Sequence, residues 1–475
     1  MVFVNLLIKP FWVFGIDRTV QNSLGGSDYG LYFAIFNFTY LFQIVLDFGL
    51  QNYNNREVAS DNSRINQLLP AILTFKTILF ILYLALCVCV AYPLGYLSKP
   101  FIWVILANQI LLSFNIYLRT NISAHQLFVK DALLSVLDKL LMIIFAAILI
   151  WGNLPGFQLS VFNFALVQLA AYLFTFFVCL IFSLKLTHKI YFSFDLKQMW
   201  GIARETLPYA VIHFLMTVYY RIDGVMLEQL QGVKGAEESG IYAQGYRIME
   251  SLNNIGYLLA TILLPLFAFR ISKQEEIKSL LKSGISIMFC VAVSIIICLF
   301  SYRFELMHLL YSSSDANYSG EVFGYLLLNF FPVAILYVIG TLLTANRNFK
   351  LMIYTLSIAV LINVLLNYYL IPVLGAKGAG LATLVTQLFM LIAYSIYVVY
   401  IFKISLQVTF LLRVLLFSAL CYLMLLLVSR FAFFGNGSQD LLMHFAAYFV
   451  AIPLFAYISG LIDEKTFQLK VGQNK

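Results

Sequence analysis

The feature that most constrains this chain is the recurrence of apolar stretches long enough to cross a lipid bilayer. They occur along the whole sequence and are separated by short groups of charged residues, Gly or Pro. A membrane-spanning helix needs about 20 mainly apolar residues. Hydrophobic residues make up 62% of the 475 positions and charged residues 11%, whereas ordinary soluble domains carry about 25% charged residues. A soluble globular fold is therefore excluded.

The pattern inside the stretches distinguishes helices from strands. Ile78–Val90 and Val414–Val428 are almost continuously apolar, whereas outer-membrane strands are segments of about ten residues that alternate in polarity. The sequence thus predicts an all-α polytopic membrane protein with about 14 transmembrane helices. The predicted spans are 2–23, 30–50, 69–97, 101–118, 132–151, 160–184, 207–228, 240–269, 284–301, 322–344, 351–371, 379–402, 410–429 and 441–462.

The positions of the 30 Lys and Arg residues test this count and orient the chain. Fifteen lie in the even-numbered connections, one (Arg413) at the inner end of the thirteenth span and three in the C-terminal tail, against five in the odd-numbered connections. Because cytoplasmic loops carry the excess of Lys and Arg, both termini are predicted to be cytoplasmic. The net charge of +8 is assigned to this membrane face, so no nucleic-acid partner is predicted.

Short motifs recur in the two halves at a nearly constant offset. Asp28-Tyr29-Gly30-Leu31-Tyr32 resembles Glu238-Ser239-Gly240-Ile241-Tyr242, and Gln168-Leu169 recurs at Gln387-Leu388. This favours duplication of a six-helix unit whose copies relate by an axis along the membrane normal. The alternative is that Gly-x-Tyr simply recurs at helix starts in a Tyr-rich chain.

The repeat predicts a division of the chain into lobes. We expect an N-terminal six-helix lobe (1–186), a cytoplasmic interfacial linker (187–206), a C-terminal six-helix lobe (207–403), and two extra transmembrane helices with a cytoplasmic tail (404–475). The linker contains Lys197, Trp200 and Arg204, a composition typical of a short amphipathic helix at the membrane surface.

Three predicted spans carry a polar stripe on one helical face. Charged groups inside a membrane are costly and point to a cavity or a partner rather than to lipid. Two explanations remain, a hydrated cavity between the halves or sealed, hydrogen-bonded helix contacts. The stripes are Tyr32, Thr39, Tyr40, Gln43 and Asp47; Tyr209, His213, Thr217, Tyr220, Arg221, Gly224 and Glu228; and Gln244, Arg247, Glu250, Ser251, Asn254, Tyr257 and Thr261.

The cations in the spans are the candidate contacts for an anionic substrate. Arg221 and Arg247 either face a cavity or extend to the membrane interface. Arg18 and Lys9 lie on opposite faces of the first span, so both cannot line one narrow cavity. The other candidates are the polar residues Tyr220, Gln244 and Asn254, and, for pairing with a cation or binding a coupling ion, the carboxylates Asp17, Asp47, Asp223 and Glu250.

Motifs for catalysis, cofactors or metals are not found in the sequence. The five His residues lack metal-binding spacing, and the glycine-rich run Gly375–Gly380 follows no strand, so it indicates a tight turn. The six Cys residues lie inside apolar runs and are interpreted as packing residues. We therefore predict no enzymatic activity, no catalytic residue, no cofactor and no metal.

Three segments together resemble the polysaccharide and oligosaccharide repeat-unit flippases of the multidrug/oligosaccharidyl-lipid/polysaccharide (MATE-like) superfamily. They are Leu24-Gly25-Gly26-Ser27-Asp28-Tyr29-Gly30-Leu31-Tyr32, Arg221-Ile222-Asp223 with Gly240-Ile241-Tyr242, and residues 371–383. The resemblance implies two six-helix lobes plus two helices in a bacterial cytoplasmic (inner) membrane. It implies alternating-access transport of a polyprenyl-pyrophosphate-linked oligosaccharide, such as an O-antigen unit, and contacts with membrane lipids and other polysaccharide-assembly proteins.

Other functions stay open from the sequence. An ion-coupled drug or small-molecule antiporter of the same superfamily would depend more on buried carboxylates than on arginines. A membrane glycan polymerase generally needs a larger external loop than Ser301–Glu321, which is the longest one predicted. A structural scaffold would have sealed polar stripes.

Overall fold

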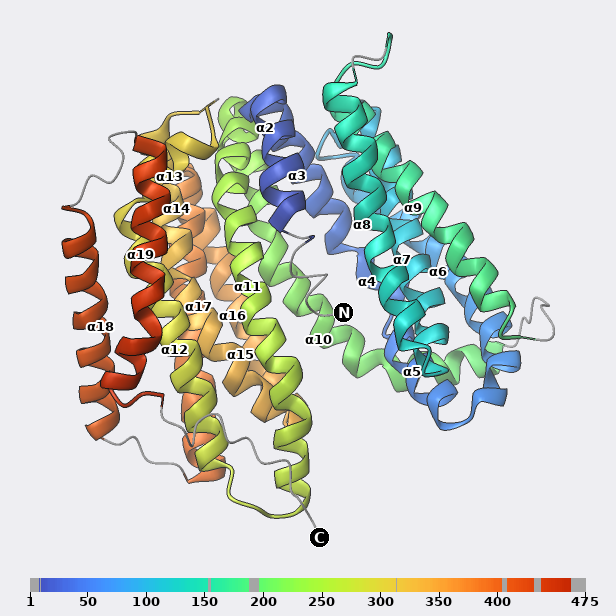
Figure 1. The fold of residues 1–475 in the computed structure, drawn as a ribbon. Helices are drawn as coiled ribbons and strands as arrows, with labels where there is room; N and C mark the ends of the chain where they lie inside the picture. The colour runs from blue at the N-terminus through green and yellow to red at the C-terminus, as the bar shows by residue number, and fades with distance from the viewer. Residues whose placement is uncertain are drawn as a thin grey trace. The chain divides into compact units, whose positions relative to one another are not determined.

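The computed structural model describes residues 8, 10–152, 155–187, 196–312, 314–403, 408–430 and 437–462. These ranges are helical and contain no strand (Figure 1). Among the described residues, twelve helices are long and apolar enough to cross a membrane, and they correspond to the third through fourteenth predicted spans. The predicted all-α polytopic fold class is thereby confirmed.

The chain divides into two compact units. Unit 1 comprises Met1–Ala243 and Asn367–Gly375, and unit 2 comprises Gln244–Leu366 and Ala376–Lys475. Helices α11 (Gly235–Ser272) and α16 (Phe349–Leu374) contribute residues to both units. The lobe boundaries at 186, 206 and 403 stay a prediction. The two units are defined by their packing, whereas the predicted lobes are defined by duplication of a six-helix unit.

Unit 1 is built from the N-terminal helices, the first residues of α11 and the last residues of α16. Its elements are η1 (Phe11–Asp17), α2 (Arg18–Leu24), α3 (Gly26–Leu41), α4 (Gln43–Asp47), α5 (Leu50–Ser60), η2 (Asn62–Arg64), α6 (Ile65–Ala91), η3 (Tyr96–Ser98), α7 (Phe101–Ala124), α8 (Phe128–Trp151), α9 (Val161–Leu184), α10 (Leu196–Leu230) and η4 (Gly232–Lys234). Those of unit 2, besides its parts of α11 and α16, are α12 (Lys278–Ser301), α13 (Arg303–Leu310), α14 (Ala316–Leu328), α15 (Phe330–Ala345), α17 (Ala376–Phe402), α18 (Val408–Val428) and α19 (Gly437–Ile458).

The first two predicted spans consist of shorter helices. The π-helical turn η1 leads into α2, and Gly25 with φ 81° separates α2 from α3. The second span continues through Phe42 into α4, which ends where Phe48 and Gly49 adopt φ values of 47° and 77°. Left-handed residues cannot continue a right-handed helix, so α4 ends at Asp47, and the second span consists of two helices joined at Phe42 instead of the single helix expected.

Residues 188–195 of the predicted linker lie outside the described residues, and its role as a linker stays a prediction. From Leu196 onward it is the beginning of α10, a helix of 35 residues that runs without interruption into the predicted seventh span. At 1.5 Å per residue, α10 is roughly 50 Å long and exceeds the thickness of a bilayer core. Trp200 on this segment is 74% exposed, as expected for a side chain at a membrane surface.

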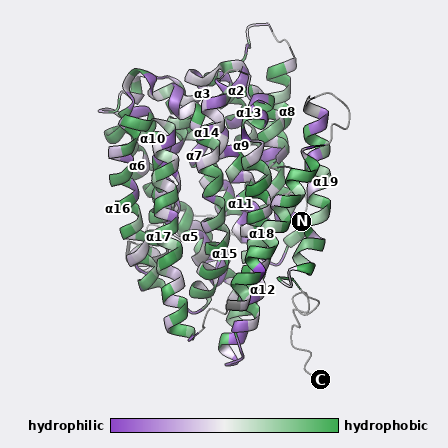
Figure 2. Ribbon diagram, turned by 90° about the vertical axis from the view of Figure 1, so that its left-hand side faces the viewer, coloured by the Kyte–Doolittle hydropathy of each residue, from purple (hydrophilic) through white to green (hydrophobic). Residues whose placement is uncertain are grey.

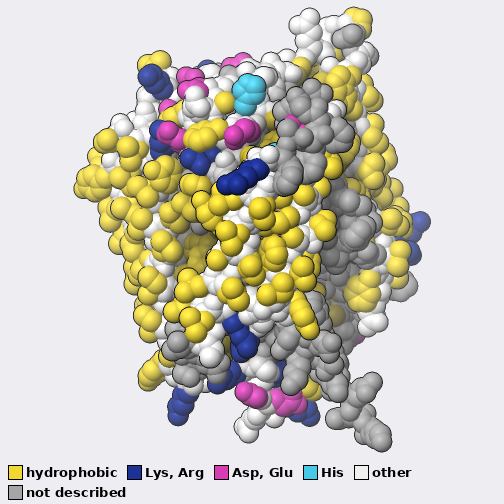
Figure 3. All heavy atoms as spheres, turned by 60° about the vertical axis from the view of Figure 1, so that its left-hand side comes forward, with side chains coloured by type: hydrophobic (Ala, Val, Ile, Leu, Met, Phe, Trp, Pro, Cys, Tyr) yellow, Lys and Arg dark blue, Asp and Glu magenta, His cyan; other side chains and the backbone are white. Residues whose placement is uncertain are grey.

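Hydrophobic residues predominate along the spanning helices (Figure 2), and many of the large ones are exposed. On α18, for example, Leu415, Leu423 and Leu427 are all more than half exposed. Figure 3 shows a face over the C-terminal helices on which hydrophobic side chains fill the middle, while Lys and Arg gather toward its ends. Such a surface is compatible with lipid as the solvent and not with water.

Inside unit 1, the two copies of the Gly-x-Tyr motif contact one another. A Cβ atom on Gly30 of α3 would lie 1.7 Å from the Ala236 carbonyl oxygen and 2.6 Å from the Gly240 nitrogen of α11. A Cβ atom on Gly240 would lie 2.1 Å from the Gly26 carbonyl oxygen. Gln21 Nε2 also donates to the Gly240 carbonyl at 2.9 Å. Glycine therefore lets two helix backbones touch, as small residues do in membrane bundles.

We expect Gly30→Ala to destabilise unit 1, because both atoms that its Cβ would meet belong to backbone that cannot rotate away. Overpacking of this kind costs about 1–3 kcal/mol or more. The measurement is the thermal midpoint of the detergent-solubilised protein. Gly201→Ala on α10 is the matched control, since its Cβ would meet nothing within 4 Å. An unchanged midpoint for Gly30→Ala would contradict the contact.

Candidate functional site

Two side chains of α3 hold Arg221 of α10 in place. Arg221 Nη1 donates to Asn37 Oδ1 at 3.3 Å, and its guanidinium carbon lies 4.8 Å from the centre of the Tyr40 ring. A cation over an aromatic ring in this geometry is stabilised by about 0.5–2 kcal/mol. Asn37 is buried, whereas Arg221 and Tyr40 stay partly exposed. The guanidinium is thus positioned but still accessible on one side.

A glycine one helical turn away brings α3 and α10 this close. A Cβ atom on Gly224 would lie 2.8 Å from Asn37 Nδ2 and 2.9 Å from a Phe33 ring carbon. Because Gly224 and Arg221 are three positions apart, they lie on one face of α10. The spacing Arg-x-x-Gly therefore sets both the helix contact and the position of the arginine.

Two predicted carboxylates are buried and bonded to tyrosines. Asp17 of η1 accepts a hydrogen bond from Tyr29 Oη at 2.7 Å. Asp223 of α10 accepts one from Tyr242 Oη at 2.7 Å and another from Asn367 Nδ2 at 2.7 Å. In both copies of the predicted repeat, an aspartate is thereby linked to a tyrosine of a helix that follows in sequence. Whether either aspartate also binds a coupling ion stays a prediction.

In unit 2, Arg247 is bonded to a carboxylate on its own helix. Arg247 Nη1 lies 3.0 Å from Glu250 Oε2, and the side chains are 11% and 37% exposed. Asn254 Nδ2 donates to the Glu250 carbonyl at 3.0 Å, and Gln244 Nε2 donates to Ser314 Oγ at 2.9 Å. The polar stripe of α11 is thus hydrogen-bonded, with Glu250 at its accessible edge.

The other predicted site residues are placed separately. Arg18 is the first residue of α2 and is partly exposed, and Lys9 lies outside the described residues. Tyr220 is partly exposed and packs edge-on against Tyr219, with ring centres 5.3 Å apart. The structure groups Arg221 with α3 in unit 1 and Arg247 with Glu250 in unit 2.

Sequence reasoning missed one buried charge, Lys76 of α6. Its side chain is 1% exposed, and Nζ donates to the Leu46 carbonyl and to Ser113 Oγ, both at 2.7 Å. A signal was available, because Lys76 is the one charged residue in the apolar helix Ile65–Ala91. It belongs to none of the three polar stripes, so a search for stripes passes over it.

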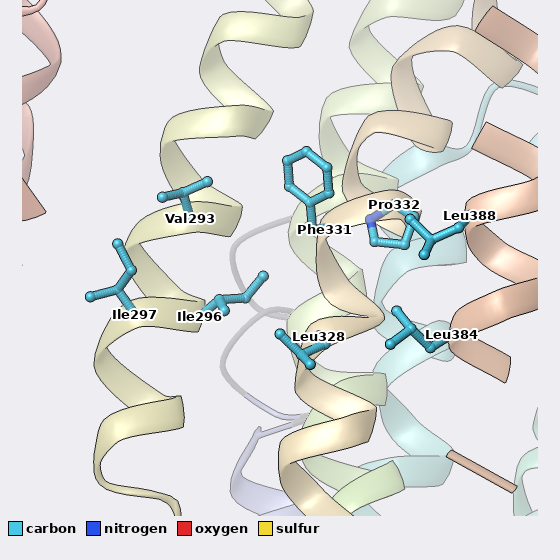
Figure 4. A pocket seen from close by; sticks show the side chains of 8 residues that line it. All are labelled: Val293, Ile296, Ile297, Leu328, Phe331, Pro332, Leu384 and Leu388. Carbon is cyan, nitrogen blue, oxygen red and sulfur yellow. The ribbon is translucent and has the colours of Figure 1, made fainter. Parts of the chain in front are cut away.

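Two surface hollows contain none of the predicted site residues. One, of about 310 Å³ in unit 2, is lined only by apolar side chains of α12, α14, α15 and α17 (Figure 4). The other, of about 370 Å³ in unit 1, is lined by apolar residues of α8, α9 and the connection between them. Apolar walls cannot replace the hydration of a charged headgroup, so neither hollow suits an anionic group.

We expect cysteine labelling to separate a hydrated stripe from a sealed one. In a variant with Cys89, the one exposed native cysteine of the six, replaced by Ala, Tyr220→Cys and Glu250→Cys should react with a membrane-impermeant maleimide in vesicles. Gln244→Cys should resist, because Gln244 is fully buried. The measurement is the labelled fraction by mass spectrometry. Resistance of both exposed positions would indicate that the stripes are sealed helix contacts.

Comparison with known proteins identifies the family. The family model described as polysaccharide biosynthesis protein matches residues 18–270, and no curated protein sequence matches the chain. Lipid II flippase MurJ in its inward closed conformation superimposes with a TM-score of 0.75 at 13% identity, covering 96% of this chain and 97% of MurJ. An inward-facing multidrug resistance MATE family transporter of the MOP superfamily gives a TM-score of 0.61 at 16% identity, covering 86% of this chain and 100% of the transporter.

These likenesses to solved structures establish the fold. The family match extends over more than half of the sequence, and the chain therefore belongs to the polysaccharide biosynthesis protein family.

Proposed function

We propose that the protein is a flippase for a polyprenyl-pyrophosphate-linked oligosaccharide. It would move this lipid from the inner to the outer leaflet of a bacterial cytoplasmic membrane by alternating access, for synthesis of a surface polysaccharide such as O-antigen. The observation that carries the proposal is the partly exposed Arg221 guanidinium, held inside a spanning helix by Asn37 and Tyr40. A charged side chain inside a membrane-spanning helix is unfavourable in free energy and therefore marks a functional site.

The chemistry of the headgroup matches this arrangement. A pyrophosphate carries concentrated negative charge, and arginine binds phosphate oxygens through two parallel N–H donors. Asn37 and Tyr40 hold the guanidinium, and arginine carries five N–H groups with which it can bind phosphate oxygens. The sugars need a polar path, while the polyprenyl tail stays in the lipid.

Arg247 suits a second contact whose strength is adjustable. Its partner Glu250 sits three residues away on α11 and is 37% exposed. A phosphate that reaches Arg247 competes with this carboxylate for the guanidinium. The ion pair of Arg247 and Glu250 forms again when the phosphate leaves. Translocation requires no covalent bond to break, so these residues are proposed to bind the substrate and not to catalyse a reaction.

An ion-coupled antiporter of the same superfamily is the second candidate. The buried carboxylates Asp17 and Asp223 support it, since such a transporter needs carboxylates away from bulk water. Transport of a small cationic compound that depends on an ion gradient, without leaflet exchange of lipid-linked sugar, would favour this function over the flippase.

We expect Arg221→Ala and Arg247→Ala each to lower leaflet exchange about 10- to 100-fold, the loss of one charge-assisted hydrogen-bonding group. The measurement uses proteoliposomes with a fluorescent undecaprenyl-pyrophosphate oligosaccharide and counts the fraction accessible to an external quencher over time. Arg221→Lys should retain part of the rate, because lysine keeps the charge and loses the bidentate geometry.

Lys99→Ala is the matched control, because Lys99 is an exposed cation at the end of η3 and outside the spans. Its exchange rate should equal that of the unaltered protein. Full exchange by correctly inserted Arg221→Ala and Arg247→Ala proteins would refute the assignment of these residues.

A further inference from the structure

Inside unit 1, the C-terminal end of α4 lies against a buried lysine, Lys76 of α6. Phe48 and Gly49 are consecutive left-handed residues between α4 and α5, an unusual conformation for a side chain as large as Phe. They interrupt the helical hydrogen-bonding pattern at the end of α4. The Leu46 carbonyl there accepts from Lys76 Nζ at 2.7 Å and from Ser113 Oγ at 3.3 Å. Lys76 therefore caps the broken end of α4.

The surroundings of Lys76 are largely neutral. Nζ donates to Ser113 Oγ at 2.7 Å and lies 5.3 Å and 5.7 Å from the centres of the Phe114 and Tyr117 rings. It forms no ion pair with any carboxylate in the part of the chain that the structure describes. Burying an ammonium costs several kcal/mol, and at Lys76 neutral hydrogen-bond acceptors and two aromatic rings offset this cost in place of an ion pair.

A carboxylate next to the capped carbonyl completes the site. Asp47 follows Leu46 directly, and it is the charged group that acts on Lys76 electrostatically. Asp47 Oδ1 is buried and accepts no hydrogen bond from the described residues. The titratable groups facing Lys76 are thus Asp47 from α4 and Tyr117 from α7. A proton that leaves Lys76 has an acceptor nearby.

We propose that Lys76 and Asp47 form a proton-coupling site. With the proton bound, Lys76 is an ammonium that holds the Leu46 carbonyl through a charge-assisted hydrogen bond. When an N–H bond of Nζ breaks, the proton passes to an Asp47 carboxylate oxygen and from there to water, which leaves a neutral amine. The coupling role rests on the proposed transport function, whereas proton binding at this site does not.

The position of α4 links the protonation of Lys76 to the residues that hold Arg221. α4 continues from α3 through Phe42, and α3 carries Asn37 and Tyr40, which hold Arg221. Loss of the charged cap weakens the end of α4 and lets this broken span change its bend. Discontinuous helices serve in this way at the ion sites of membrane transporters.

The test measures amide hydrogen exchange in peptides covering residues 42–53 between pH 6 and pH 9, with each rate divided by the intrinsic rate at that pH. In the unaltered protein, protection should fall about tenfold as pH rises, because the charged cap is lost. Lys76→Arg should stay protected throughout, since arginine keeps its proton. Lys76→Met should show low protection at every pH, and Lys99→Met, which removes an exposed lysine, should behave like the unaltered protein.

Several outcomes would overturn the proposal. Protection that does not change with pH in the unaltered protein would do so, as would a normal pH dependence in Lys76→Arg. If Lys76→Arg fails to insert, Asp47→Asn decides: loss of the neighbouring negative charge should move the transition to lower pH, and an unmoved transition contradicts the site. A protein that shows the exchange transition but flips no lipid-linked oligosaccharide would refute the proposed function and leave the proton site standing.

Discussion

A bilayer core supplies no hydrogen-bond partners, and this constraint decides where the polar side chains of the spanning helices lie. Asn54 Nδ2 donates to Asn121 Oδ1 and Thr120 Oγ1 at 2.9 Å, so one amide group of α5 is bonded to two polar side chains of α7. Asn108 and Asn115 of α7 donate to backbone carbonyls of α9 at 3.1 and 3.0 Å. Polar groups of this kind fix which helices are neighbours, whereas apolar contacts in lipid discriminate weakly between helices.

The same constraint ties the candidate site to the glycines of unit 1. The helix α3 touches the backbone of α11 at Gly30 and approaches Gly224 of α10 at Phe33 and Asn37, so two contacts fix its course. Arg221 can be bonded to Asn37 only because no Cβ at Gly224 separates the helices. The orientation of the Arg221 guanidinium is therefore a consequence of backbone packing, which also brings Asn37 and Tyr40 into contact with it.

The sequence predicted the fold more fully than the site. Apolar runs identified the spans because hydrophobicity is a local property, and the repeat of Gly30 and Gly240 was visible as an offset. Their direct contact was not predictable, since it depends on how distant helices cross. Neither was the break at Phe48, because a bulky residue gives no local signal for a left-handed conformation. Lys76 was overlooked for a related reason, as its partner is a backbone carbonyl and carries no signature in the sequence.

The proposed transport function requires that an anion be bound without being retained, and the pair of Arg247 and Glu250 suits both requirements. An isolated buried guanidinium would hold a phosphate tightly, because in a low-dielectric site the two charges attract strongly. Glu250 lowers the net gain, since the phosphate must first displace a carboxylate bonded at 3.0 Å. Being more exposed than Arg247, Glu250 can turn toward water when displaced and return afterwards. Binding that is favourable enough to enter and weak enough to leave is the general requirement for passage, and a neighbouring carboxylate satisfies it without any change in the fold.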